Sequence, residues 1–179
     1  MAERTVGLKA PHFEMKTVDG EGKNFGSVTL NGYKGKWLVM FFYPLDFTFV
    51  CPTEIKGYNS KIDEFRAMNA DILGVSTDSE HSHKAWINAA ADQGGLGKLK
   101  LPLASDMTQK VARDYGVLIE EEGIALRGLF IIDPEGILRY SVIHDLNVGR
   151  SVDETLRVLK ALQSGGLCPI DWMPGDETL

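Results

Sequence analysis

Residues 36–44 read Lys36-Trp-Leu-Val-Met-Phe-Phe-Tyr-Pro44, an apolar run that ends at a proline. Strands buried on both faces of a sheet have such uninterrupted apolar sequences, so this run predicts a central strand. Apolar residues then recur three or four positions apart between Thr48 and Asn69, which predicts a helix. A helix that begins just after a central strand places its first residues where open α/β sheets usually bind ligands.

The rest of the chain continues this pattern of strands and helices. Residues 1–35 are rich in glycine and polar residues, which favour hairpins and turns. Further along, the sequence predicts a strand over 71–77, a helix from Ser79 through Ile87, a loop over 94–97, a short helix over 108–115, strands over 125–132 and 137–144 with a turn between them, and a helix over 151–163. Ser151 and Glu154 resemble a capping box at the start of that last helix.

This order of elements predicts the fold class. Strands that alternate with helices, followed by a hairpin and a last helix, indicate an α/β fold of the thioredoxin-like type, with a mixed central sheet and helices on both faces. Residues 1–163, N-terminal extension included, are expected to form one domain. Residues 164–179 begin at the helix-ending glycines 165 and 166 and are expected to form a C-terminal tail that carries Cys168.

Composition and charge exclude several classes of function. The 179 residues are 44% hydrophobic and 25% charged, as in a globular protein. With a formal net charge of -6 and no dense basic cluster, the chain does not have the composition of a nucleic-acid-binding protein. Its sequence contains no apolar run long enough to cross a membrane and no signal-peptide pattern at the start, so we expect a cytoplasmic protein.

The chain has two cysteines, Cys51 and Cys168, which lie 168 - 51 = 117 residues apart. A framework of structural disulfides is not expected in the cytoplasm, and no C-x-x-C pair exists. If both thiols take part in redox chemistry, tertiary or quaternary structure must bring them together. Cys51 lies near the start of the first predicted helix, where unpaired N–H groups and the helix dipole favour the nucleophilic thiolate. A lone cysteine without such surroundings is more commonly a small core residue.

The segment around Cys51 resembles the active site of the peroxiredoxin family, whose pattern is Pro-x-x-x-Thr/Ser-x-x-Cys. Here the pattern is complete as Pro44, Thr48 and Cys51, within the run Phe42-Tyr-Pro-Leu-Asp-Phe-Thr-Phe-Val-Cys-Pro-Thr-Glu54. The resemblance extends over nearly the whole chain and includes Ala10-Pro-His-Phe13, Gly74-Val-Ser-Thr77 with Trp86, Arg127-Gly-Leu-Phe-Ile-Ile-Asp133 and Gly149-Arg-Ser-Val-Asp-Glu-Thr155. The tail Gly166-Leu-Cys-Pro169, with Trp172, is similar to the resolving-cysteine segment of typical two-cysteine peroxiredoxins, the alkyl hydroperoxide reductase C or thioredoxin peroxidase family.

This resemblance implies a thiol-dependent peroxidase that reduces hydrogen peroxide and organic hydroperoxides to water or alcohol. Cys51 would attack the peroxide and become a sulfenic acid, and Cys168 of a second subunit would condense with it to an intersubunit disulfide. A thioredoxin or a flavoprotein disulfide reductase would then reduce the disulfide. No cofactor or metal is implied. The chain would form a homodimer through the edge strand 137–143 and a decameric ring of five dimers, with Phe47 near the second interface.

The family pattern also assigns roles to residues around Cys51. Arg127 would hold the thiolate and polarise the O–O bond, Thr48 would hydrogen-bond the peroxide, and Pro44 would shield the sulfur. Glu54 and Arg150 are weaker candidates, with Glu54 orienting Arg127. Without the family pattern, Arg127 would be interpreted as a charged residue at the edge of a strand, and Glu54 and Arg150 as members of surface ion pairs.

Other functions stay open at this point. A thioredoxin-like disulfide oxidoreductase is compatible with the fold, although the missing C-x-x-C argues against it. A chaperone-like holdase belongs to a different class of function and could be a second role. The pair His81-x-His83 could contribute to a metal site, but nothing beside it completes a ligand set. We expect these two histidines at a solvated helix start.

Overall fold

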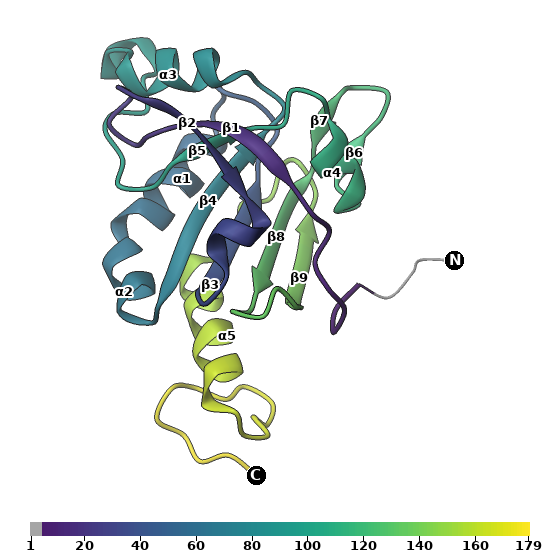
Figure 1. The fold of residues 1–179 in the computed structure, drawn as a ribbon. Coiled ribbons are helices and arrows are strands. Elements are labelled where there is room, and N and C mark those ends of the chain that lie inside the picture. The colour runs from purple at the N-terminus through teal and green to yellow at the C-terminus, as the bar shows by residue number, and fades with distance from the viewer. Residues whose placement is uncertain (1–4) are drawn as a thin grey trace.

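A computed structural model describes residues 5–179 of the protein. Its main sheet has seven strands in the order β2-β1-β5-β4-β3-β8-β9 (Figure 1). The strands of this sheet are β1 (Glu14–Val18), β2 (Phe25–Thr29), β3 (Trp37–Phe42), β4 (Ala70–Ser76), β5 (Leu103–Ser105), β8 (Arg127–Ile132) and β9 (Leu138–His144). β3 runs parallel to β4 and antiparallel to β8, so the sheet is mixed, as the sequence predicts.

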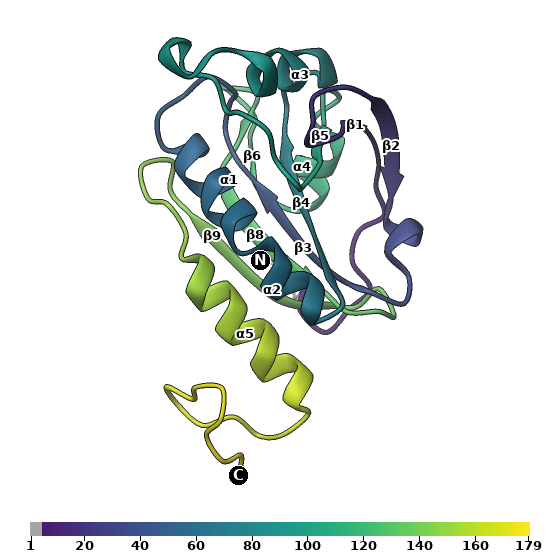
Figure 2. The ribbon, with the colours of Figure 1, turned by 90° about the vertical axis from the view of Figure 1, so that its left-hand side faces the viewer.

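Helices cover both faces of this sheet. The helices are α1 (Cys51–Ser60), α2 (Ile62–Ala67), α3 (Glu80–Asn88), α4 (Lys110–Asp114) and α5 (Val152–Ser164), with the 3-10 turns η1 (Leu30–Tyr33) and η2 (Ala91–Gln93). Side chains of α1, α2, α3 and α5 share one apolar core with the sheet, and α4 packs into a second core on the other face. In Figure 2, α1, α2 and α5 lie side by side in front of the strands. The α/β fold of thioredoxin-like type is therefore confirmed.

β3 is the central element that its sequence predicts. Its residues from Leu38 onward are wholly buried, as is Tyr43 just after it. Because β3 is sandwiched between β4 and β8 and covered on both faces, every one of its side chains meets an apolar neighbour. The end of this strand is consequently a rigid point from which the next segment leaves the sheet.

The sequence predicts one helix between Thr48 and Asn69, but the structure has two helices there, so this prediction is wrong. α1 begins at Cys51, and Lys61, with a ψ of 5°, separates it from α2. Two polar side chains lie just before the break: the Asn59 Oδ1 accepts a hydrogen bond from the backbone N–H of Lys100, and the Ser60 hydroxyl donates to the Gly57 carbonyl within α1. A bond of the second kind competes with the helical hydrogen bonds.

Three short strands of the structure were not predicted as separate elements. β5 has only three residues and pairs with β1 and β4, and β6 (Leu118–Ile119) and β7 (Ile124–Ala125) form a small separate hairpin. Elements of two or three residues carry too little periodicity to be recognised in a sequence. None of the helices described has the length and apolar character required to cross a lipid bilayer.

The predicted helix starts at Ser79 and Ser151 are confirmed. The Ser79 hydroxyl accepts a hydrogen bond from the N–H of Ser82, and the Ser151 hydroxyl accepts one from Glu154. The capping box is only half formed, because the Glu154 carboxylate binds Arg157 at 2.6 Å in place of the N–H of Ser151.

The prediction of a solvated His83 is wrong. His83 is wholly buried, and its two ring nitrogens lie 2.8 Å from the Asp46 carboxylate and 3.1 Å from the Ala104 carbonyl oxygen. The Tyr43 hydroxyl donates to the same Asp46 carboxylate at 2.9 Å. His83 thus ties the segment after β3 to α3 and β5. Among the described residues, no group of three or more His, Cys, Asp or Glu side chains is placed to hold a metal ion.

Candidate active site

Cys51 is the first residue of α1 and is wholly buried. It follows β3 after eight residues, 43–50, that turn at Phe47, whose φ of 57° lies in the left-handed region. Pro52 occupies the first turn of α1, where its missing N–H removes no helical hydrogen bond. Val50, just before the helix, supplies no side-chain cap. The sulfur therefore sits at an uncapped helix N-terminus, whose positive dipole end favours an anion.

Arg127 brings a positive charge to this sulfur. It is the first residue of β8 and is 3% exposed. Its Nη1 lies 3.5 Å from the Sγ of Cys51 and donates to the Glu54 carboxylate at 2.7 Å. The structure thus brings Cys51, Glu54 and Arg127 together, although they come from α1 and from a strand more than seventy residues later.

Glu54 is shared by two arginines. Arg150 donates to its carboxylate from Nε, from Nη2 and from its backbone N–H, at 2.8, 2.9 and 2.8 Å. Burial raises the pKa of the Glu54 carboxyl. The hydrogen bonds and charge of Arg150 and the charge of Arg127 lower it by more, so the pKa lies below its ordinary value. Arg150 also donates to the carbonyls of Phe42 and Gly128 in the two central strands.

The charges of this cluster do not cancel. Two buried guanidinium groups face one buried carboxylate, so the site carries one positive charge in excess. An uncompensated buried charge is costly, and a thiolate at Cys51 would neutralise it. The Nη1 of Arg127 is already directed at the sulfur that would carry that negative charge. The site therefore presents its excess positive charge to the sulfur of Cys51.

Pro44 and Thr48 lie in the segment that leads into α1. Pro44 is buried and Thr48 is partly exposed. The Thr48 hydroxyl donates to the Leu45 carbonyl at 2.9 Å, which uses its proton and leaves its lone pairs free to accept a hydrogen bond. In the described part of the chain Thr48 makes no hydrogen bond to Cys51.

Cys168 lies in the tail that follows α5, and the structure does not bring it to Cys51. Both cysteines are free thiols. In Figures 1 and 2 the tail hangs below α5, at the end of the molecule opposite the start of α1. Trp172 anchors the tail: its ring is buried, its indole N–H donates to the Asp176 carbonyl, and its own carbonyl accepts a hydrogen bond from Arg157 at 2.9 Å.

Sequence reasoning missed two features of the site. One is the backbone carbonyl of Leu146, which accepts a hydrogen bond from the Nε of Arg127 at 2.7 Å and leaves no signature in the sequence. The other is the buried Asp46–His83 pair. His83 could have been found, because it lies three residues before Trp86 on the apolar face of α3.

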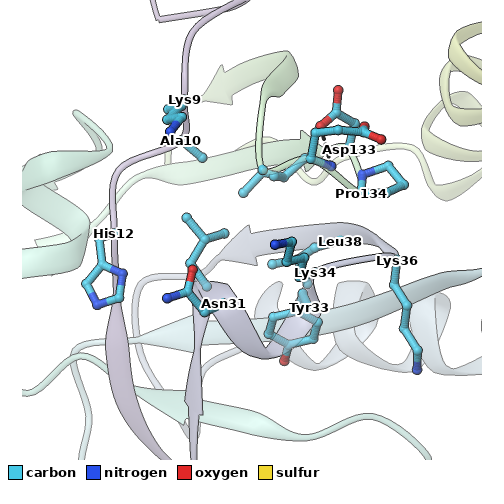
Figure 3. Close-up of a pocket in the computed structure, with 14 residues that line it drawn as sticks. Lys9, Ala10, His12, Asn31, Tyr33, Lys34, Lys36, Leu38, Asp133 and Pro134 are labelled. Carbon is cyan, nitrogen blue, oxygen red and sulfur yellow. Dashed lines mark hydrogen bonds between the residues drawn. The ribbon is translucent and has the colours of Figure 1, made fainter.

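A cavity of about 340 Å³ lies at the other end of the sheet. Figure 3 shows its lining side chains, among them Lys9, Asn31, Tyr33 and Leu38, which come from the N-terminal segment, η1 and the start of β3. Because Cys51 follows the end of β3 and this cavity adjoins its beginning, the cavity is not part of the site around Cys51.

Comparisons with known proteins agree on one family. The AhpC/TSA family matches residues 6–141 of the chain. A putative peroxiredoxin in a rubredoxin operon of Clostridium pasteurianum is 66% identical, with 99% of each chain covered. Peroxiredoxin-1 of Gallus gallus is 54% identical over 97% of this chain and 89% of its own. The crystal structure of reduced Plasmodium vivax two-cysteine peroxiredoxin superimposes with a TM-score of 0.95 at 39% identity, over 98% of this chain and 93% of its own.

Proposed function

Because the chain belongs to the AhpC/TSA family and is a thiol-dependent peroxidase, we propose that Cys51 is the residue that attacks the peroxide. The contact of 3.5 Å between the Sγ of Cys51 and the Nη1 of Arg127 carries this proposal. The excess positive charge around Glu54 favours the thiolate, which is the nucleophilic form of cysteine. Burial of the sulfur keeps solvent and bulky reactants away from it.

In the proposed first step the thiolate of Cys51 attacks the terminal oxygen of a hydroperoxide. An S–O bond forms, the O–O bond breaks, and the leaving oxygen takes a proton to become water or alcohol, while the sulfur is oxidised to a sulfenic acid. Arg127 stabilises the negative charge that moves from sulfur to the leaving oxygen. The Thr48 hydroxyl accepts a hydrogen bond from the peroxide, and Pro44 covers the sulfur. Hydrogen peroxide and organic hydroperoxides are both proposed substrates.

In the second step the thiol of Cys168 from a partner subunit attacks the sulfenic sulfur, and water leaves as an intersubunit disulfide forms. One observation supports a partner rather than the same chain: the tail lies at the opposite end of the molecule from the start of α1 (Figure 1). Cys51 itself is wholly buried. The first turn of α1 must therefore unwind before the disulfide can form, and the missing side-chain cap at Val50 lowers the cost of unwinding.

The proposed assembly follows from the edge of the sheet. β9 is an edge strand, and its Ile143 is 45% exposed, so it can pair with its copy to form a homodimer. Five dimers would form a decamer, with the half-exposed Phe47 near the second interface. A thioredoxin or a flavoprotein disulfide reductase is the proposed electron donor, and the cytoplasm the proposed location.

The test of this function is peroxide consumption with each reductant in turn, alongside an insulin-reduction assay. We expect peroxide consumption and no insulin reduction, and the opposite pattern would favour a disulfide oxidoreductase. Mixing the variants Cys51→Ser and Cys168→Ser tests the partner role. After peroxide addition, a non-reducing gel should show a cross-linked dimer only in the mixture, because only there do an intact Cys51 and an intact Cys168 face each other. A mixture without cross-links would mean that the disulfide forms within one chain.

A further inference from the structure

Arg127 is held at two points, and only one of them is a charged side chain. Its Nη1 donates to Glu54, and its Nε donates to the carbonyl of Leu146, each at 2.7 Å. A planar guanidinium that is bound at one nitrogen can still swing about that bond, whereas two bonds at different nitrogens fix its plane. The carbonyl of Leu146 therefore decides whether Nη1 is directed at the sulfur of Cys51.

The turn that carries this carbonyl connects the two arginines of the site. β9 ends at His144, which pairs with Arg127, and the chain then passes through residues 145–149 to Arg150. Arg150 is held by backbone carbonyls of β3 and β8, in the core of the sheet. Arg127 has no such core anchor for its Nε, because its second acceptor belongs to the turn. Of the two arginines, Arg127 is thus the one whose orientation depends on the turn.

Hydrogen bonds, not apolar packing, give the turn its shape. The Asp145 carboxylate accepts a hydrogen bond from the N–H of Leu146 at 2.7 Å, and the Asp145 carbonyl accepts one from the N–H of Val148 at 3.1 Å. The Nδ1 of His144 lies 3.3 Å from the Val148 carbonyl and can donate to it. Asp145 and Val148 are exposed. With so little buried surface, the turn should relax when the carboxylate of Asp145 is removed.

We propose that Asp145 is a positioning residue for the peroxidase reaction. Its carboxylate shapes the turn that presents the Leu146 carbonyl to Arg127, and Arg127 in turn faces the sulfur of Cys51. This inference rests on the proposed role of Cys51. The proposal also predicts a decrease in the reactivity of Cys51, which loss of the Asp145 charge alone would not produce. Loss of a negative charge cannot disfavour the thiolate, so removal of the Asp145 charge alone would not make Cys51 less reactive. A change in the shape of the turn would make Cys51 less reactive.

Three variants separate these effects. Asp145→Ala removes the acceptor and the charge, and Asp145→Asn removes the charge but keeps an oxygen that can accept from Leu146. Asn147→Ala is the matched control, because Asn147 is an exposed residue of the same turn whose side chain makes no hydrogen bond with the described residues. The measurements are the second-order rate of Cys51 oxidation by hydrogen peroxide, the pH profile of Cys51 alkylation, and sedimentation as a check on assembly.

We expect Asp145→Ala to lower the oxidation rate about tenfold, since small misplacements of a catalytic group have effects of at least this size. Its alkylation profile should move to higher pH, while Asp145→Asn and Asn147→Ala stay within about twofold of the wild type in both measurements. A wild-type rate in Asp145→Ala, an unmoved alkylation profile, or an equal loss in Asp145→Asn would each overturn the proposal. If peroxide did not oxidise Cys51 in the wild type, the proposed function would be refuted instead.

Discussion

Cys51 and Cys168 are the same chemical group in two different surroundings. Cys51 is wholly buried at the start of α1 and receives a hydrogen bond from Arg127 within a cluster of excess positive charge. Cys168 is partly exposed in the tail, and among residues 5–179 its sulfur has neutral hydrogen-bond partners alone: the Ser164 hydroxyl at 3.5 Å and the carbonyl oxygens of Ala161 and Gly166 at 3.8 and 3.9 Å. The first thiol is buried beside a cation, and the second lies partly exposed in the tail beside neutral groups.

This contrast suggests a division of work between the two regions. Attack on a peroxide requires a nucleophile and a cation in fixed positions, which the core strands provide. The resolving step requires a thiol that can move to meet its partner, and segments with few buried contacts are the ones that move at low cost. One region cannot satisfy both requirements, so we expect the two thiols to respond differently to the same experiment.

The largest difference should come from replacing each cysteine with serine. Cys51→Ser should abolish peroxide reduction, because in the part of the chain that the structure describes Cys168 has no adjacent cation. Cys168→Ser should still be oxidised once at Cys51, at the wild-type rate, but should not turn over with a dithiol reductant. Stopped-flow oxidation and steady-state consumption measure the two steps separately. Equal loss of the first oxidation in both variants would remove the distinction between the regions.

The next largest effect should be on folding, through Glu54. Glu54→Gln leaves two buried arginines without a counter-charge and should cost about 3–5 kcal/mol of the free energy of unfolding. Glu64→Gln, which removes an exposed carboxylate paired with Lys61 at 3.0 Å, is the control and should cost less than about 1 kcal/mol. Urea unfolding measures both variants.

Acid should reduce the difference in stability between the wild type and Glu54→Gln. Because the pKa of the folded Glu54 carboxyl is lowered, its contribution to stability is complete above its unfolded pKa of about 4.3 and is lost as the pH falls through the folded value. The wild type should therefore lose more stability than Glu54→Gln when the pH falls from neutral to below about 4. Parallel loss in the two proteins would mean that Glu54 is not the titrating group.

A smaller effect is expected when lysine replaces Arg127, because lysine keeps the positive charge but not the planar guanidinium group. Arg127→Lys should lower the rate of Cys51 oxidation by roughly 10²-fold, because an ammonium group cannot bind the sulfur, Glu54 and the Leu146 carbonyl together as a planar guanidinium does. Arg139→Lys, in the same β8–β9 hairpin but bound to Asp133 away from the site, should leave the rate unchanged. A wild-type rate in Arg127→Lys would show that charge alone is sufficient.

The smallest effect should be found in the tail. Arg157→Ala removes the hydrogen bond to the Trp172 carbonyl and a partly exposed ion pair with Glu154, and should change the free energy of unfolding by less than about 1 kcal/mol. The tail should nevertheless be cut faster by a protease, while the rate of Cys51 oxidation stays the same. Lys160→Ala, also on α5, is the control. Unchanged proteolysis would mean that Arg157 does not hold the tail.

The sequence predicts the elements that depend on local pattern. The apolar run that forms β3, the hairpin of β8 and β9, and the serine caps of α3 and α5 all follow from residue types at short spacing. The break at Lys61 does not, because the apolar spacing continues through it; beside the break, the Asn59 side chain accepts a hydrogen bond from Lys100, some forty residues away. Tertiary contacts of this kind override local propensity.

The candidate site divides in the same way. The motif around Cys51 carries enough residues to indicate the family, and with it the candidates Glu54, Arg127 and Arg150. Their placement comes from strands and loops far apart in the chain, and the Leu146 carbonyl is invisible in a sequence because every residue has one. The burial of His83 could be inferred only by giving more weight to its helical spacing from Trp86 than to its polarity.

Trp172 makes the tail visible to spectroscopy. Trp172 lies four residues after Cys168 and is 6% exposed, and its indole N–H donates to the Asp176 carbonyl. Release of the tail would move this indole into water and shift its emission to longer wavelengths, while Trp86, wholly buried in the body of the protein, would keep its surroundings. A Trp172→Phe variant would remove the signal and identify its source. The fluorescence of the unlabelled protein would therefore report on any release of the tail that carries Cys168.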